Sequence, residues 1–164
     1  MGEAKTGDDF ITHEFDEAIA IQRSIVEAET ALSTKHPVAS AKRAIKGSLA
    51  DDRSFLEQLE TLGKPHGATG KIEDVAGGLT ELMSETLATA TMEGADSDFY
   101  EAHAVLLNLK RKQMDSAGGM LAIARDQKDS ELRKASLAFR RAQTATSKNL
   151  TDELAAYAVQ IAAG

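Results

Sequence analysis

Histidines and carboxylates are the side chains of this 164-residue chain that could bind a metal or transfer a proton. A di-metal site inside a helical bundle takes one Glu from each of two helices and a Glu-x-x-His pair from each of the other two, because residues i and i+3 project from the same helix face. Each of the four histidines would therefore need a Glu three positions before it. The residues at those positions are Phe10, Ser33, Gly63 and Tyr100. The sequence thus lacks any Glu-x-x-His pair, which argues against a di-iron enzyme.

The distribution of acids along the chain is equally unfavourable for such a site. No Asp, Glu or His occurs from Leu132 to Thr151 or from Ala104 to Met114, the interiors of two predicted helices. Too few oxygen ligands remain for iron or manganese. Nothing spaces Ser, His and Asp as a nucleophile elbow or a catalytic triad either. We therefore expect no metal, no other cofactor and no catalytic residue, and hence a protein that is not an enzyme.

An alternative interpretation keeps a reduced metal site. The acids that could form it are Glu29, Asp51 and Asp52, with Glu27 as a substitute for Glu29. In that case the chain would be an iron-binding protein or a metal-dependent oxidase.

Polar side chains also recur among the apolar residues of the predicted helices. Helical spacing places five of them on stripes that otherwise face a core, namely Gln22, Glu29, Asp52, Gln113 and Gln143. One interpretation is an interior polar network in which amides donate hydrogen bonds to carboxylates, because buried polar groups are tolerated only when they are hydrogen-bonded. The other is that some of these residues lie at the edge of the core and face water.

The histidines divide into two groups. His103 follows Phe99 by four residues and precedes Leu106 by three, so we expect a hydrogen-bonded histidine in or beside the core. His36 and His66 stand next to prolines in predicted loops, and we expect both to face water.

Basic residues gather in three short clusters, which are Lys110-Arg111-Lys112, Arg133-Lys134 and Arg140-Arg141. Adjacent residues of a helix point in different directions, so none of these clusters forms one flat patch. We expect a solvated face whose charges pair with acids of neighbouring helices or of a second subunit.

Apolar residues recur every three or four positions between clear breaks, which predicts amphipathic helices. Their predicted bounds are about 10–33, 37–63, 72–93, 97–125 and 129 toward the C-terminus. Pro37 is expected as the first residue of the second helix, Gly63 as its C-terminal cap, and Asp98 with Glu101 as a capping pair of the fourth. The pattern predicts an all-α, antiparallel four-helix bundle with one additional shorter helix. It comprises residues 10–164 as one domain, after a disordered segment 1–9.

Composition restricts the setting of the protein. The chain has no cysteine, its N-terminus lacks the apolar stretch of a signal peptide, and no apolar run approaches the roughly 18–20 residues of a membrane span. We therefore expect a cytoplasmic protein that does not bind a membrane. The net charge of −7 and the scarcity of aromatic residues argue against nucleic acid as a partner.

Charge is divided unevenly along the chain. Residues 1–103 hold 9 Lys and Arg against 20 Asp and Glu, a net of −11, whereas residues 104–164 hold 10 against 6, a net of +4. Acidic and basic helices that lie side by side would screen one another within the chain. We also expect a homodimer or a larger homo-oligomer, in which the Ala- and Leu-rich segment from Leu154 to Ala163 buries apolar surface. An alternative is an adaptor that docks an acidic partner on the last two helices.

One family resembles this chain in the order of its segments. Phe55-Leu-Glu-Gln-Leu-Glu-Thr-Leu-Gly63, a Lys/Gly loop, and Ile72-Glu-Asp-Val-Ala-Gly-Gly-Leu79 with Glu81 and Glu85 are similar to the bacterial stress-associated ferritin-like family (the YciE/YciF group). The resemblance extends more weakly to Ala145-Thr-Ser-Lys-Asn-Leu-Thr151 and covers residues 15–155.

This resemblance implies a ferritin-like fold and a link to stress responses. It places the family's metal ligands near Ser48, Leu49 and Asp51, near Leu109 to Gln113, and near Ala142 and Gln143. Only Asp51 among these positions has a side chain of a ligand type. The function that we expect is therefore a structural or stress-related role of a ferritin-like bundle without an intact di-iron site and without a defined catalytic activity.

Overall fold

The computed structural model describes residues 5–72 and 75–164, in which every regular element is helical. The elements are α1 (Gly7–Lys35), α2 (Ala39–Gly63), the 3-10 turn η1 (Lys64–His66), α3 (Val75–Glu93), α4 (Asp96–Gln127) and α5 (Ser130–Ala162). The prediction of an all-helical protein with four long helices and a shorter one is confirmed for this part of the chain. Of the segment 1–9 that was predicted to be disordered, residues 1–4 lie outside the described residues, and α1 already begins at Gly7. None of the helices described is long and apolar enough to cross a membrane.

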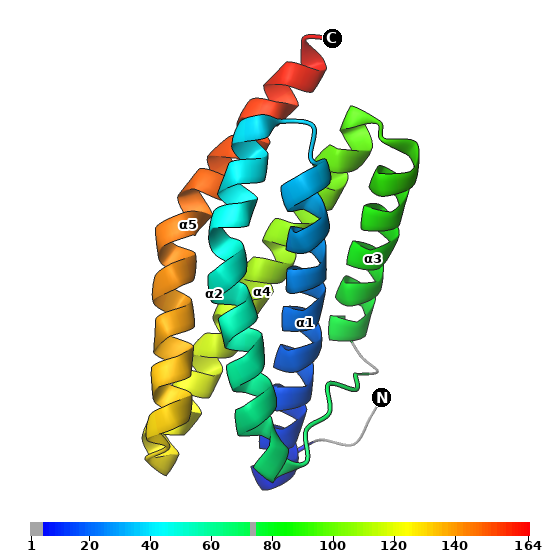
Figure 1. The fold of residues 1–164 in the computed structure, drawn as a ribbon. Coiled ribbons are helices and arrows are strands. Elements are labelled where there is room, and N and C mark those ends of the chain that lie inside the picture. Colours follow the sequence, from blue (N-terminus) through cyan, green and yellow to red (C-terminus); the bar gives the residue numbers. More distant parts are fainter. Residues whose placement is uncertain (1–4, 73–74) are drawn as a thin grey trace.

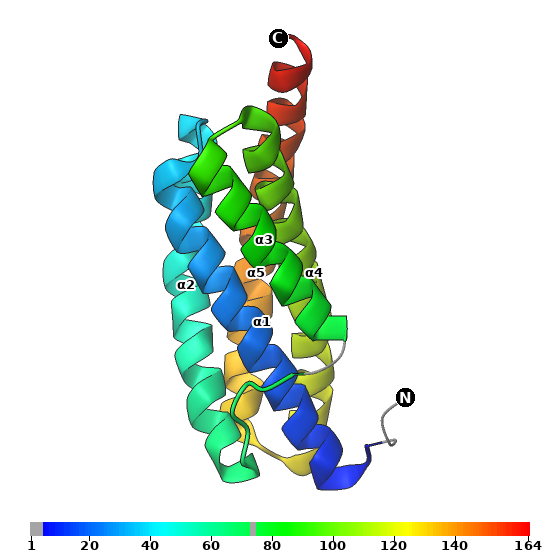
Figure 2. The same ribbon diagram turned by 90° about the vertical axis from the view of Figure 1, so that its right-hand side faces the viewer.

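Four of the helices form a bundle and the fifth packs on its outside. Helix α1 contacts α2 and α4, and α5 contacts the same two helices from the opposite corner. Neighbouring helices of this ring run antiparallel (Figure 1). Helix α3 lies outside the ring against α1 and α4, as Figure 2 shows from the side. It carries the chain from one end of the bundle back to the other, so that α2 and α4 run in the same direction.

The start of α2 differs from the sequence prediction. The helix begins at Ala39, two residues after Pro37. The backbone N–H of Val38 donates to Nδ1 of His36 at 3.1 Å, and Val38 is extended, with φ −97° and ψ 118°. A side chain therefore fixes the turn between the first two helices, and the helical dihedrals begin only after it.

Two other predicted helix ends are also corrected. Gly63 is not a left-handed cap, because its φ is −78°, and Gly67 adopts the left-handed conformation instead. A Cβ at Gly63 would lie 3.1 Å from Cβ of Ala68, so this glycine allows a close approach of the chain. Asp98 does not cap α4, which begins at Asp96 without a side-chain hydrogen bond at its start.

The core has two hydrophobic clusters, one toward each end of the bundle. The first contains Ile25, Leu32, Ile45, Leu106 and Leu150, among others, and also binds the inner face of α3. The second contains, among others, Phe15, Phe55, Leu59, Met120 and Phe139. The rings of Phe55 and Phe139 stack at 4.2 Å between α2 and α5. On α2, α4 and α5, buried polar residues stand between the residues of these two clusters.

Candidate functional site at the centre of the bundle

Lys110 of α4 lies inside the bundle, with only 6% of its surface exposed. Its Nζ donates to Oε2 of Glu29 at 3.1 Å, to Oγ of Ser48 at 3.1 Å and to Oδ2 of Asp52 at 2.9 Å. An ammonium group has three N–H donors, and each of them has an acceptor here. The prediction that Lys110 belongs to a solvated basic face is therefore wrong.

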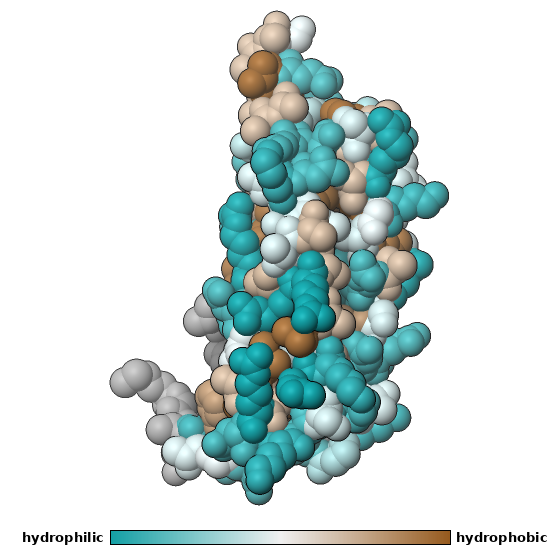
Figure 3. All heavy atoms as spheres, turned by 90° about the vertical axis from the view of Figure 1, so that its left-hand side faces the viewer, coloured by the Kyte–Doolittle hydropathy of each residue, from teal (hydrophilic) through white to brown (hydrophobic). Residues whose placement is uncertain are grey.

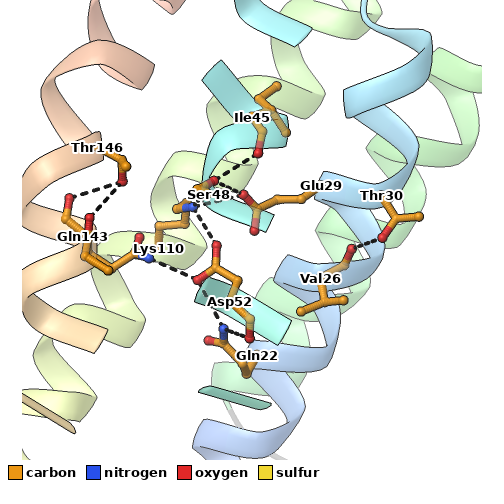
Figure 4. A network of polar contacts seen from close by, with 11 residues as sticks. Gln22, Val26, Glu29, Thr30, Ile45, Ser48, Asp52, Lys110, Gln143 and Thr146 are labelled. Atoms are coloured by element: carbon orange, nitrogen blue, oxygen red, sulfur yellow. Dashed lines mark hydrogen bonds and ion pairs between the residues drawn. The ribbon is translucent and has the colours of Figure 1, made fainter. Parts of the chain in front are cut away.

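Asp52 accepts hydrogen bonds from side chains of three other helices (Figure 4). Its Oδ1 accepts hydrogen bonds from Nε2 of Gln22 at 3.2 Å and from Nε2 of Gln143 at 3.0 Å. Its Oδ2 accepts the bond from Lys110. Helices α1, α4 and α5 thus each direct a donor at one carboxylate of α2, and both of its oxygens are satisfied.

The amides extend this network toward the second hydrophobic cluster. Nε2 of Gln113 donates to Oε1 of Gln22 at 3.1 Å and to the carbonyl of Ala18 at 2.7 Å. Gln22 in turn donates to Asp52, so the N–H dipoles follow one direction along the chain of bonds. All five residues that were predicted as an interior network are buried. The structure joins them through these contacts, with Glu29 connected by way of Lys110 and Ser48.

Sequence reasoning missed the two residues that complete the cluster, Lys110 and Ser48. The spacing contains a signal for the first, because Lys110 follows Leu106 by four residues and precedes Gln113 by three, which places all three on one helix face. Spacing alone does not predict burial of this residue, because lysines are almost never fully buried unless they are paired.

Of the acids of the proposed reduced metal site, only Glu29 and Asp52 are brought together. Asp51 and Glu27 are exposed, whereas Glu29 and Asp52 are fully buried. Between the latter two lies the Lys110 ammonium, and the nearby amides donate to Asp52 with their N–H groups. Such a donor set repels a metal ion and does not fit a di-iron centre. Within residues 5–72 and 75–164, no three His, Asp or Glu side chains are arranged to hold a metal.

A smaller ion pair joins α1 to α4 near the central cluster. Lys112 is paired with Glu17 and also donates to Oγ of Ser116 at 3.2 Å, while Nε2 of His13 lies 3.7 Å from Glu17. Together with the pairs of Lys110, this contact means that part of the acidic and basic halves of the chain neutralise each other within one molecule. The remaining Arg111 is exposed.

A histidine pair lies near the other end of the core. His36 is 1% exposed and His103 is fully buried, so the prediction that His36 faces water is wrong. Because Val38 N–H donates to Nδ1 of His36, the hydrogen of His36 is on Nε2, which lies 3.2 Å from Nδ1 of His103. His103 in turn donates from Nε2 to the carbonyl of Leu150 at 3.2 Å. Both rings are thus neutral and form a directed chain from the α1–α2 turn to α5.

Burial decides the protonation of this pair. Burial is the main reason that the pKa of His36 is lowered from 6.5 to about 4, and the adjacent His103 contributes to this shift. Burial also lowers the pKa of His103. His66, in contrast, is half-buried and stacks on Phe15 with ring centroids 5.1 Å apart. In each ring of the His36–His103 pair, Nδ1 accepts a hydrogen bond. A protonated imidazolium has no nitrogen that can accept, so protonation of either histidine would break a bond of this chain.

A hollow of about 440 Å³ leads from the surface between α4 and α5 to the central cluster. Lys110 and Gln143 contribute to its lining, together with the apolar side chains of Leu107, Met114 and Leu150. Lys110 and Gln143 are therefore the residues of the cluster that line this opening.

Comparisons with known proteins identify no family for the chain. No model of a known protein family matches the sequence, and no curated protein matches it. The described residues form an all-helical protein of five α-helices with antiparallel packing.

Proposed function

We propose that this protein is a non-catalytic, ferritin-like helical bundle with a structural or stress-related role, in which the Lys110 ammonium is the interior cation. The observation that carries the proposal is the position of Nζ, within 3.1 Å of both Glu29 and Asp52 at the centre of four helices. A positive charge between two buried carboxyls has the electrostatic effect that a metal ion would have there, without a ligand field or an open coordination position.

The connection between the helices supports the ferritin-like part of the proposal. Bundles of that type have one long crossover between two antiparallel helix pairs. Here α1 and α2 form one pair, α4 and α5 form the other, and the segment with α3 spans the length of the bundle between them (Figure 1). Three residues near the positions where the family resemblance places metal ligands, Ser48, Gln113 and Gln143, belong to the central network.

The use of the polar groups of Lys110 and Asp52 supports the non-catalytic part of the proposal. All three N–H donors of Lys110 and both oxygens of Asp52 are bound inside the bundle. A nucleophile or base needs a lone pair that a substrate can reach. The cluster therefore holds the four helices together.

We also propose that the protein assembles as a homo-oligomer.

Metal analysis tests the proposal. Protein expressed with added iron, and separately with manganese, is dialysed and its metal content is measured per chain. We expect far less than one equivalent of either metal. Two equivalents of iron per chain would overturn the proposal in favour of a metal-dependent oxidase or an iron-binding protein.

A pair of charge-reversal variants provides the control for that measurement. Lys110→Glu replaces the interior cation by a third carboxylate, and Lys148→Glu makes the same change on the surface of α5, where Lys148 pairs with exposed Asp152. If the wild-type protein and both variants retain the same small amount of metal, surface binding accounts for it. Loss of stoichiometric metal from Lys110→Glu alone would show that the wild-type interior is a metal site.

A further inference from the structure

The central cluster contains more acidic groups than basic ones. Glu29 and Asp52 have no exposed surface, and among the described residues Lys110 is the one ammonium that contacts them. The charged groups that act on Glu29 are Lys110 from α4 and Asp52 from α2. Helix α5 contributes only the neutral amide of Gln143 to this cluster. With both acids ionised, the interior of the bundle would carry a net charge of −1, which burial makes costly.

The two carboxyl groups are solvated very differently by the protein. Asp52 accepts three hydrogen bonds from Gln22, Gln143 and Lys110, distributed over both of its oxygens. Glu29 has contacts only at Oε2, and its buried Oε1 has no hydrogen-bond partner among the described residues. A carboxylate with one bare oxygen is far less stable in an apolar interior than one with three donors. The negative charge therefore belongs to Asp52.

The hydrogen bonds of Ser48 indicate which group carries the hydrogen between Ser48 and Glu29. Its Oγ donates to the carbonyl of Ile45 at 3.0 Å and is also hydrogen-bonded to Oε2 of Glu29. A hydroxyl has a single hydrogen, and a backbone carbonyl can only accept. Ser48 has two acceptors within reach, Ile45 and Glu29, and only one hydrogen for them. In the arrangement in which it donates to Ile45, the carboxyl group of Glu29 supplies the hydrogen of the second bond.

We infer that Glu29 is a neutral carboxylic acid in the folded protein, which donates from Oε2 to Ser48 and leaves Lys110 and Asp52 as an electroneutral ion pair. The bundle interior is therefore a proton-binding site, and folding at neutral pH takes up one proton from solution. This inference concerns the charge state of the cluster and does not depend on the role proposed for the protein.

The buried environment also changes the pKa of Glu29. Burial is the largest of the causes that raise the pKa of Glu29 from 4.5 to about 9. The neighbouring carboxylate of Asp52 also raises the pKa, whereas Lys110 and Ser48 lower it. The contribution of Glu29 to the free energy of unfolding therefore decreases as the pH rises from about 4.5 to about 9, and above that pH the cluster is an anion.

A reciprocal pair of isosteric variants tests the inference. Glu29→Gln replaces a neutral acid by a neutral amide that can still donate to Ser48, so we expect a denaturation midpoint at pH 6 close to that of the wild type. Asp52→Asn removes the ionised partner of Lys110 and is expected to lower the midpoint strongly. Glu27→Gln, a change of an exposed acid on the same helix, serves as the matched control and should have no effect. The opposite order of the first two variants would overturn the inference.

Proton uptake gives a second readout on the same proteins. Between about pH 6.5 and 8.5 the unfolding equilibrium constant of the wild type should rise about tenfold per pH unit relative to Glu29→Gln, since one proton is released on unfolding. Parallel pH profiles of the two proteins would contradict the inference.

A measurement on the wild type covers the case in which a variant does not fold. Infrared difference spectra or carbon NMR of protein labelled at glutamate carboxyl carbons distinguish a protonated acid from a carboxylate. We expect one protonated glutamate in the folded protein at pH 7 and none after denaturation. Signals from ionised glutamates alone in the folded state would overturn the inference.

Discussion

His36 and His103 form a hydrogen bond of 3.2 Å whose direction is fixed at both ends, by the N–H of Val38 and by the carbonyl of Leu150. This bond links the turn between α1 and α2 to α4 and α5. Because each ring is needed as both donor and acceptor, the link exists only while the two histidines are neutral.

Acid is therefore expected to weaken the protein through this pair. The pKa of His36 is about 4 in the folded state against 6.5 in the unfolded state, so the unfolded chain binds more protons between these values. The free energy of unfolding then falls as the pH decreases from about 6.5 to 4, by up to about 2–3 kcal/mol. Glu29 acts with the opposite sign, because its pKa is raised, so a comparison with a variant is needed.

His36→Asn isolates the contribution of the histidine, because Asn keeps an acceptor for Val38 N–H and does not titrate. Urea denaturation at several pH values should show the wild type losing more stability than the variant on acidification. Two curves that remain a constant distance apart from pH 7 to 4 would contradict this account.

Removal of the interior cation is expected to be costly. Lys110→Met leaves the buried carboxylate of Asp52 without its ion-pair partner and Oε2 of Glu29 without a donor, which should reduce the free energy of unfolding by about 3–5 kcal/mol at pH 7. Lys148→Met breaks an exposed pair with Asp152 and should change stability by less than about 1 kcal/mol. Chemical denaturation of both variants measures the difference, and equal effects would show that Lys110 is not held by the cluster.

The amides should matter through the groups that they satisfy. Gln143→Ala deprives Asp52 of one donor, and Gln113→Ala leaves Oε1 of Gln22 and the carbonyl of Ala18 without theirs. We expect each change to cost roughly 1–3 kcal/mol. Gln58→Ala on the exposed face of α2 is the control, and its effect should remain within about 0.5 kcal/mol. An effect as small as that of the control at either buried position would disprove its place in the network.

Self-association should depend on the end of α5, which extends beyond the other helices (Figures 1 and 2). Apolar atoms are visible on this end in Figure 3, and Val159 is 70% exposed. Ion pairs on the surface contribute only about 0–1 kcal/mol each, so an oligomer needs apolar contacts such as these. Light scattering of wild type and of Val159→Asp, with Gln160→Asp as control, measures the assembly.

We expect the wild type and the Gln160→Asp variant to exceed the monomer mass of 17.5 kDa, and the Val159→Asp variant to approach it. A monomer in all three samples, at low and at high salt and at tens of micromolar protein, would contradict self-association. The acidic and basic parts of the chain would then contact each other only within one molecule.

The helices could be predicted from the sequence because their information is local. Apolar residues at three- and four-residue spacing located all five helices to within a few residues of their ends. Ends are set by single side chains, and these were harder to predict. The contact of His36 with Val38 N–H moved the start of α2 to Ala39, and Asp129, which accepts from Leu132 N–H at 3.1 Å, caps α5.

Part of the candidate site could be predicted from the sequence for the same reason. Helical spacing placed Gln22, Gln113 and Gln143 on inner stripes, where the structure also has them. It could not reveal that His36, in a loop, is covered by the rings of Phe99 and Tyr157 from other helices. Nor could it show that Lys110 meets two acids from α1 and α2, because the pairing of distant helices is a tertiary property.

The polar layer between the two hydrophobic clusters has a consequence for how the helices are aligned along the bundle axis. Stripes of Leu, Ile and Ala pack nearly as well when one helix slides by a turn, about 5.4 Å. Such a shift of α4 would place Leu106 or Met114 where Lys110 now meets Asp52, and would leave two acids against hydrocarbon. We therefore expect the layer to select a single axial register for α1, α2, α4 and α5, much as a buried polar residue does in a coiled coil.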